Sequence, residues 1–145
     1  DLNPDRQVRP IKDCIVKDVA FNVDLAVASS NISQLETFIS SELFGRERLL
    51  SNALEQVRDE YDFVFIDTHS NYDQIFLNAI IACDLVIPTM RTDFQNLQKF
   101  VDTINNLKGM ARQGVNPSVG GVICTSFEWN TLQSKQCIDF LENNN

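Results

Sequence analysis

Four short apolar runs restrict most strongly how this sequence can fold, and three of them are nearly continuous instead of alternating. The runs are Val23–Ala28, Phe63–Ile66, Leu85–Ile87 and Val119–Cys124. A continuous apolar run bounded by polar residues is typical of a strand that is covered on both faces, as in a parallel sheet. We therefore expect these runs to be the strands of a mostly parallel sheet.

Segments with helical periodicity separate the runs. In the stretch that begins at Phe94, apolar residues recur every three or four positions, which predicts a long amphipathic helix. Gly45 divides the region before Phe63 into two helices. The remaining expected helices are Ser33–Phe44, Arg46–Arg58, Gln74–Cys83 and Asn130–Leu141. Strands that alternate with helices predict an α/β fold with helices on both faces of the sheet.

Length and charge limit the function classes. A chain of 145 residues is the size of one domain, so we expect a single domain over 1–145. A net charge of −8 repels phosphate and anionic lipid, so any contact with nucleic acid must be local or supplied by a partner. No apolar stretch approaches the ~20 residues that a membrane span needs. We expect a cytoplasmic protein without a membrane partner, whose four cysteines are reduced core residues.

The carboxyl ends of the strands are where a parallel α/β fold binds ligands. Asp67 follows the Phe63–Ile66 run directly, and an apolar strand that ends in a carboxylate is the Walker B arrangement. Asp67 would then face Mg²⁺, directly or through a bound water. In the alternative interpretation Asp67 merely ends the strand, and Ser70, with Asp73 three residues on, caps the next helix.

Other residues near the expected strand ends are weaker candidates for a ligand-binding or catalytic site. His69 is the only histidine and has no nucleophile nearby in sequence, so we expect a loop histidine that faces solvent. Thr125 ends the last run, and Phe127 and Trp129 follow it as a packing pair. The sequence has no G-x-x-x-x-G-K-[ST] loop for phosphate binding.

Five stretches, in this order, resemble the ParA/Soj partition ATPases of the ParA/MinD deviant-Walker group. The letters NVDLAVASSN, GRERLL, YDFVFIDT, LNA and GVICT are similar to the family's NLDLIPSN strand, GRE-x-RL helix, Walker B segment, LNAL helix and final G-h-h-h-T strand, where h is apolar. They begin at positions 22, 45, 61, 77 and 121. The resemblance extends over nearly the whole chain.

This resemblance implies a P-loop NTPase-like fold and a set of roles. Asp67 would be the catalytic Walker B acid, which binds Mg²⁺ through water. Thr68 would lie near the γ-phosphate and Thr125 towards the base of the nucleotide. Thr89, Arg91 and Asp93 would lie in a loop on the side where family dimers communicate. The complete protein would use ATP and Mg²⁺, form a homodimer, and bind a partition adaptor protein and nonspecific DNA.

Two departures from the family pattern change these expectations. The family's two prolines after the Asp-Thr pair are His69 and Ser70 here, and the Walker A and A′ motifs are absent, so the chain resembles the middle portion of the family. Without a lysine and backbone N–H groups around the phosphates, a Walker B carboxylate only adds negative charge. We expect no tight ATP binding and no hydrolysis by this chain alone. Without the Walker A strand, Phe63–Ile66 would need a second chain, a rearranged strand or an upstream segment to complete the sheet.

Two functions remain open. The first is a fragment or truncated relative of a ParA-type ATPase for plasmid or chromosome partition. The alternative is a non-catalytic interaction protein that retains the ParA-like fold. A phospho-accepting receiver domain is excluded, because Ser29–Asn31 offers no acidic pair and Thr125–Phe127 no lysine.

Overall fold

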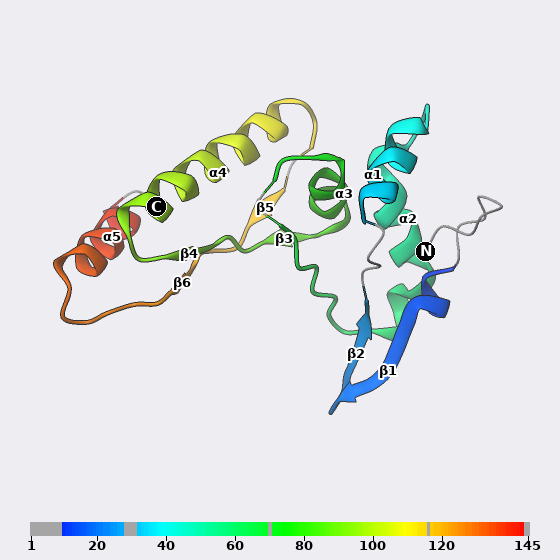
Figure 1. Cartoon of the computed structure of the whole chain (residues 1–145), viewed down its shortest axis with the longest axis horizontal. Helices are drawn as coiled ribbons and strands as arrows, with labels where there is room; N and C mark the ends of the chain where they lie inside the picture. Colours follow the sequence, from blue (N-terminus) through cyan, green and yellow to red (C-terminus); the bar gives the residue numbers. More distant parts are fainter. Residues whose placement is uncertain (1–9, 28–31, 70, 116, 144–145) are drawn as a thin grey trace. The chain divides into compact units, whose positions relative to one another are not determined.

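The computed structural model describes residues 10–27, 32–69, 71–115 and 117–143. Contacts within the chain group it into two compact units, Asp1–Cys83 and Asp84–Asn145. Helices are combined with strands in both units, and strands of the second unit pair in parallel, so the α/β class is confirmed (Figure 1). The single domain over 1–145 stays a prediction.

The first unit opens with an antiparallel hairpin. After the short 3-10 helix η1 (Ile11–Cys14), strand β1 (Ile15–Ala20) pairs with β2 (Val23–Ala26), with Val16 opposite Leu25. The prediction of a parallel strand from Val23 is therefore wrong in orientation. Only two residues connect β1 to β2, whereas a parallel neighbour needs a crossover of about a dozen residues or more. Ala28 lies outside the described residues.

Short helices form the rest of the first unit. In chain order they are α1 (Ile32–Ser41), η2 (Arg46–Arg48), α2 (Leu49–Leu54), η3 (Glu55–Glu60) and α3 (Gln74–Ala82). Gly45 has a φ of 69° and separates α1 from η2, as predicted, because glycine enters the left-handed region without steric cost. The helix expected over Arg46–Arg58 is instead divided into η2, α2 and η3. The buried apolar side chains of this unit are Ile39, Val57, Phe76, Ala79 and Ile80.

The segment between η3 and α3 differs most from its prediction. None of residues 61–69 belongs to a strand, so the strand expected over Phe63–Ile66 is absent from the structure. Phe63 and Phe65 are 81% and 90% exposed, and their rings stack with centroids 6.5 Å apart. The physical reason is pairing: a strand forms only beside a neighbour that accepts its backbone hydrogen bonds, and the described residues place none there.

The second unit holds the parallel pairs. Strand β3 (Leu85–Val86) pairs with β5 (Ser118–Val119), and β4 (Thr89–Arg91) pairs with β6 (Ile123–Thr125). Two expectations change. The run Val119–Cys124 is divided at Gly120 and Gly121, and the loop expected to contain Thr89 and Arg91 is strand β4.

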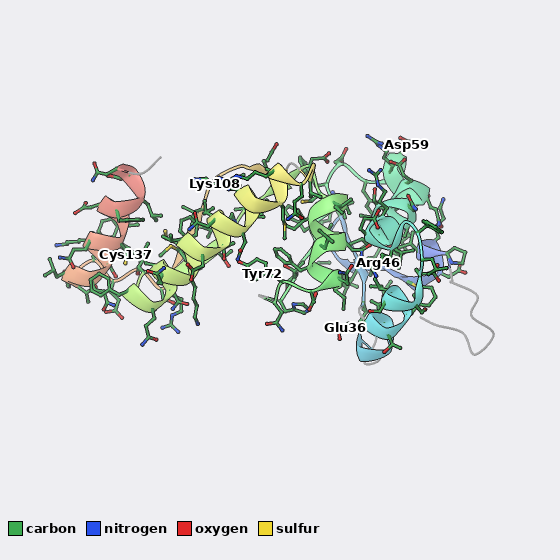
Figure 2. All side chains as sticks on the ribbon, turned by 90° about the horizontal axis from the view of Figure 1, so that it is seen from above. Glu36, Arg46, Asp59, Tyr72, Lys108 and Cys137 are labelled. Atoms are coloured by element: carbon green, nitrogen blue, oxygen red, sulfur yellow. The ribbon has the colours of Figure 1, made fainter. Side chains whose placement is uncertain are left out.

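Two helices complete the second unit. Helix α4 (Phe94–Arg112) begins where the periodicity predicted, and α5 (Leu132–Asn143) corresponds to the expected last helix. Buried apolar side chains come from β4, α4 and α5, namely Met90, Leu107 and Cys137. Figure 2 labels Cys137 on α5, and its side chain has no exposed surface. Burial raises the pKa of its thiol, which favours the protonated form of a core cysteine.

Candidate functional site

Asp67 and Thr68 lie near the carboxyl end of the segment 61–69 in the first unit, which forms no helix or strand. Both are exposed. Since the apolar residues before them form no strand, the position of the Asp67 carboxylate depends on how the two ends of the segment are attached. The structure gives contacts at both ends.

Tyr61 attaches the beginning of the segment to the hairpin. Its hydroxyl donates to Oδ2 of Asp24 at 2.7 Å and accepts from Nζ of Lys17 at 2.8 Å. Lys17 Nζ also lies 2.9 Å from the same Asp24 oxygen. The hydrogen bonds from Lys17 and Tyr61 lower the pKa of Asp24 from 3.8 to about 2, and those with Tyr61 and Asp24 raise the pKa of Lys17. Beside this network Lys12 pairs with Glu60 and lowers the pKa of that carboxyl group.

His69 attaches the other end to helix α3. Its Nε2 lies 3.3 Å from Oδ2 of Asp73, and its Nδ1 accepts from the N–H of Asn71 at 3.3 Å. The histidine is exposed, as expected of a loop residue. Asp73 is also the N-cap of α3, because its Oδ1 accepts from Ile75 and Phe76 at 3.0 Å. The cap expected at Ser70 is therefore wrong, and Ser70 itself lies outside the described residues.

Thr125 belongs to the second unit, so the three predicted nucleotide-binding residues are divided between the two units. It is exposed at the end of β6, and its Oγ1 donates to the carbonyl of Met90 on β4 at 3.2 Å. Phe127 and Trp129 pack edge to face with centroids 4.9 Å apart, as expected of a packing pair. The trace after Thr125 passes through Ser126, whose φ of 54° is unusual for a residue other than glycine.

The loop after β6 is held by buried hydroxyl groups that the sequence patterns did not indicate. Thr92 Oγ1 donates to the carbonyl of Ser126 at 3.2 Å and lies 2.9 Å from Oγ of Ser134. Ser134 Oγ in turn accepts from the N–H of Glu128 at 3.3 Å. Thr92 is 5% exposed and Ser134 3%. The only available signal in the sequence was that Thr92 and Ser134 are small polar residues near helix starts. Such a signal does not reveal that Thr92 contacts residues 34 and 42 positions away.

The residues expected in a dimer-facing loop have local structural roles. Thr89 and Arg91 are the ends of β4, with Thr89 opposite Ile123 and Arg91 opposite Thr125. Asp93 is the N-cap of α4 and accepts from the N–H of Asn96 at 2.8 Å. Hydrogen bonds from Asn96 hold the pKa of Asp93 below its usual value. Strand pairing and helix capping therefore account for the positions of Thr89, Arg91 and Asp93, and their place at a dimer contact stays a prediction.

The fit of Mg²⁺ and ATP depends on the donor set. The described part of the chain contains no group of three or more His, Cys, Asp or Glu side chains that would hold a metal ion. Mg²⁺ is usually bound by one or two carboxylates together with waters and substrate phosphates. The exposed carboxylate of Asp67 fits one such contribution to a nucleotide-bound ion. It does not amount to an independent metal site.

No helix in the described ranges is long and apolar enough to cross a membrane.

Comparison with protein families gives a match that extends over most of the chain. The family model AAA_31, described as "AAA domain", matches residues 5–119. An uncharacterised protein of Pseudomonas putida is 33% identical over 89 residues, which cover 60% of this chain and 34% of that protein. The chromosome partitioning protein ParA of Myxococcus xanthus is 24% identical over 133 residues, 90% of this chain and 46% of ParA.

Solved structures share the fold. An ATP complex of Cyanothece McdA superposes with a TM-score of 0.82 at 18% identity, over 93% of this chain and 54% of McdA. A plasmid partition protein from Borrelia burgdorferi gives a TM-score of 0.76 at 21% identity, over 94% and 56%. The resemblance to ParA-type partition ATPases and the P-loop NTPase-like fold are thus confirmed. The chain spans 32% to 50% of the length of the curated relatives it matches.

Proposed function

Because the chain belongs to the AAA_31 family of AAA domains and resembles ParA-type partition ATPases over most of its length, we propose that it is one part of such an ATPase for plasmid or chromosome partition. One observation carries the proposal. Asp67 is an exposed carboxylate directly after the apolar segment Phe63–Ile66, in the sequence context that resembles Walker B. In the same proposal the protein acts in the cytoplasm.

Asp67 is the residue that would orient Mg²⁺ through a bound water. Thr68, its neighbour, would lie on the side of the γ-phosphate, and Thr125 of the second unit towards the base. Bound Mg²⁺ would supply charge neutralisation for the β- and γ-phosphates. The five glycines of the sequence form no phosphate loop, so the cradle for the phosphates belongs to polypeptide outside these 145 residues. The chain by itself should not hydrolyse ATP.

The exposed Phe63–Ile66 segment supports a partner that completes the sheet. A strand supplied by upstream polypeptide or a second chain would accept its backbone hydrogen bonds and cover its aromatic side chains. A homodimer, a partition adaptor protein and nonspecific DNA are further partners of the complete protein in this proposal. With a charge of −8, the DNA-binding surface would come from elsewhere in the complete protein.

Mg·ATP titration tests the central role of Asp67. In a protein extended upstream of Asp1 to include the phosphate-binding loop, Asp67→Asn should weaken Mg·ATP binding by about 10- to 100-fold, the usual effect of losing an outer-sphere partner of a metal. Asp62→Asn is the matched control, because Asp62 is also an exposed carboxylate of the same segment. It should bind Mg·ATP as the parent protein does. Equal affinities for both variants would contradict the assignment of Asp67.

A second candidate is a non-catalytic interaction protein that retains the fold. Its supporting observation is the absence of a phosphate loop from the sequence beside an exposed aromatic pair, Phe63 and Phe65. The same titration separates the candidates, because an extended protein that binds no Mg·ATP favours the interaction protein.

A further inference from the structure

We propose that His69 is a positioning residue that fixes the Asp67–Thr68 segment to the N-terminus of α3 through its contact with Asp73. The inference rests on the proposed function, because it explains how the candidate Mg²⁺ ligand is held in place. Nε2 of His69 lies 3.3 Å from Oδ2 of Asp73, and Asp67 is only two residues away in sequence.

One imidazole nitrogen accepts a hydrogen bond, and the other lies near a carboxylate oxygen. The backbone N–H of Asn71 donates to Nδ1, and a nitrogen that accepts from an N–H carries no proton itself. In the neutral ring the proton is therefore on Nε2, the nitrogen that faces the Asp73 carboxylate. One ring thus lies in contact with both the N–H of Asn71 and the cap of the next helix.

Asp73 is a firm attachment point. While its Oδ2 faces His69, its Oδ1 accepts from two backbone N–H groups of the first turn of α3. The helix is itself held in the first unit by Asn78, which is 4% exposed and donates to the carbonyl of Arg46 at 2.8 Å. Figure 2 shows Arg46 beside α3. Movement of His69 relative to the core is therefore limited by contacts on both sides of Asp73.

The segment before His69 needs such a contact. Residues 61–69 form no strand, so backbone pairing does not restrict Asp67 in the described chain. The contact between His69 and Asp73 supplies a restriction at the end of this segment.

NMR gives a direct measurement, because His69 is the only histidine of the chain. Long-range ¹H–¹⁵N spectra of the 145-residue protein, recorded where the ring is neutral, should show one imidazole in the Nε2–H tautomer. Asp73→Asn should move the Nε2 resonance, since the asparagine cap keeps an acceptor for α3 but presents no carboxylate to the ring. An equilibrium mixture of tautomers, or spectra unaffected by Asp73→Asn, would overturn the contact.

Amide hydrogen exchange measures its effect on the segment. His69→Asn keeps a side-chain oxygen that accepts from Asn71, as in an Asx turn, but loses the contact with Asp73. His69→Asn and Asp73→Asn should each raise exchange at residues 67–71 several-fold, while the amides of α3 after its first turn keep their protection. The double variant should exchange no faster than either single variant, because both remove the same contact.

A matched control and the nucleotide assay complete the test. Asp93→Asn makes the same change at the cap of α4, where Asp93 accepts from the N–H of Asn96, and should leave residues 67–71 unaffected. Additive effects of the two substitutions, or none, would overturn the proposal. In the extended protein His69→Asn should raise the Kd for Mg·ATP several-fold. A parent protein that does not bind Mg·ATP contradicts the proposed function instead, and unchanged affinity of the variant contradicts the positioning role.

Discussion

Asn78 donates through Nδ2 to the carbonyl of Arg46 at 2.8 Å, across 32 positions of sequence. Its Oδ1 accepts from the N–H of Leu50 at 3.2 Å. That N–H belongs to the first turn of α2, whose own N-cap residue Arg48 makes no side-chain cap. A buried amide on α3 therefore caps α2 and joins the two helices.

Asn78→Ala should destabilise the protein by about 2 kcal/mol, because it leaves the part-buried hydrogen bonds to the N–H of Leu50 and the carbonyl of Arg46 unmade. The measurement is the free energy of unfolding in urea. Ser40→Ala, at an exposed position of α1, is the control and should change the free energy by less than about 0.5 kcal/mol. A loss of the same size in both variants would show that Asn78 has no capping role.

Acid should weaken the attachment of Tyr61 to the hairpin. Since the pKa of Asp24 in the folded state, about 2, lies below its ordinary value of 3.8, the contribution of Asp24 is present above about pH 4 and is lost as the pH falls towards 2. Urea midpoints measured between about pH 6 and pH 2.5 should therefore fall more steeply for the parent protein than for Asp24→Asn.

Tyr61→Phe provides the intermediate control for this acid dependence. It removes one hydrogen bond to Asp24 and leaves Lys17 in place, so its acid dependence should lie between those of the parent and Asp24→Asn. If all three proteins had the same slope, the carboxylate network would not contribute to stability.

Thr92 and Ser134 should behave as a coupled pair. Thr92→Val and Ser134→Ala each remove one hydroxyl from a buried hydrogen bond of 2.9 Å, and each should cost about 1–3 kcal/mol. The double variant should cost clearly less than the sum, because the two hydroxyls share one bond.

A double-mutant cycle of urea unfolding measures this coupling. Thr103→Val is the control, because Thr103 donates to the carbonyl of Lys99 within its own helix α4. Its effect should add to that of Thr92→Val. Strict additivity of Thr92→Val with Ser134→Ala would argue against the shared bond.

Gly120→Ala should destabilise the second unit through one neighbour. A Cβ at position 120 would lie 2.6–2.8 Å from three side-chain atoms of Leu85 on β3, well inside contact distance. Overpacking of this kind typically costs about 1–3 kcal/mol. Leu85→Ala in the same protein should recover part of the loss, and thermal unfolding of the single and double variants is the measurement. If Leu85→Ala recovered none of the lost stability, Leu85 would not be the residue with which the new methyl group clashes.

Periodicity and continuous apolar runs predicted the helices and strands that depend on residues close together in sequence. Helix α4 begins at Phe94 as its apolar spacing indicated, and Leu85 and Val119 fall in parallel strands. The continuous apolar run Phe63–Ile66 was not enough for a strand, because strand formation also needs a neighbour that lies elsewhere in sequence. The roles of Asn78 and Thr92 depend on partners 28 to 42 positions away, and single-sequence patterns carry no such information.

The candidate site was predicted in the same uneven way. Asp67 was proposed as a site residue from sequence alone, and its role stays a prediction. The contact of His69 with Asp73 was missed, although the spacing of four residues before an apolar helical run was available as a signal.

The two-residue connection between β1 and β2 has a consequence for the order of folding. Such a hairpin closes a very short loop and typically forms in about 1–10 μs. The parallel pairs join Leu85 to Ser118 and Thr89 to Ile123. More than thirty residues lie between the partners of each pair, so closing these loops costs more entropy than closing the hairpin. In stopped-flow refolding, the fluorescence of the single tryptophan, Trp129, should therefore change after the earliest far-ultraviolet signal of secondary structure.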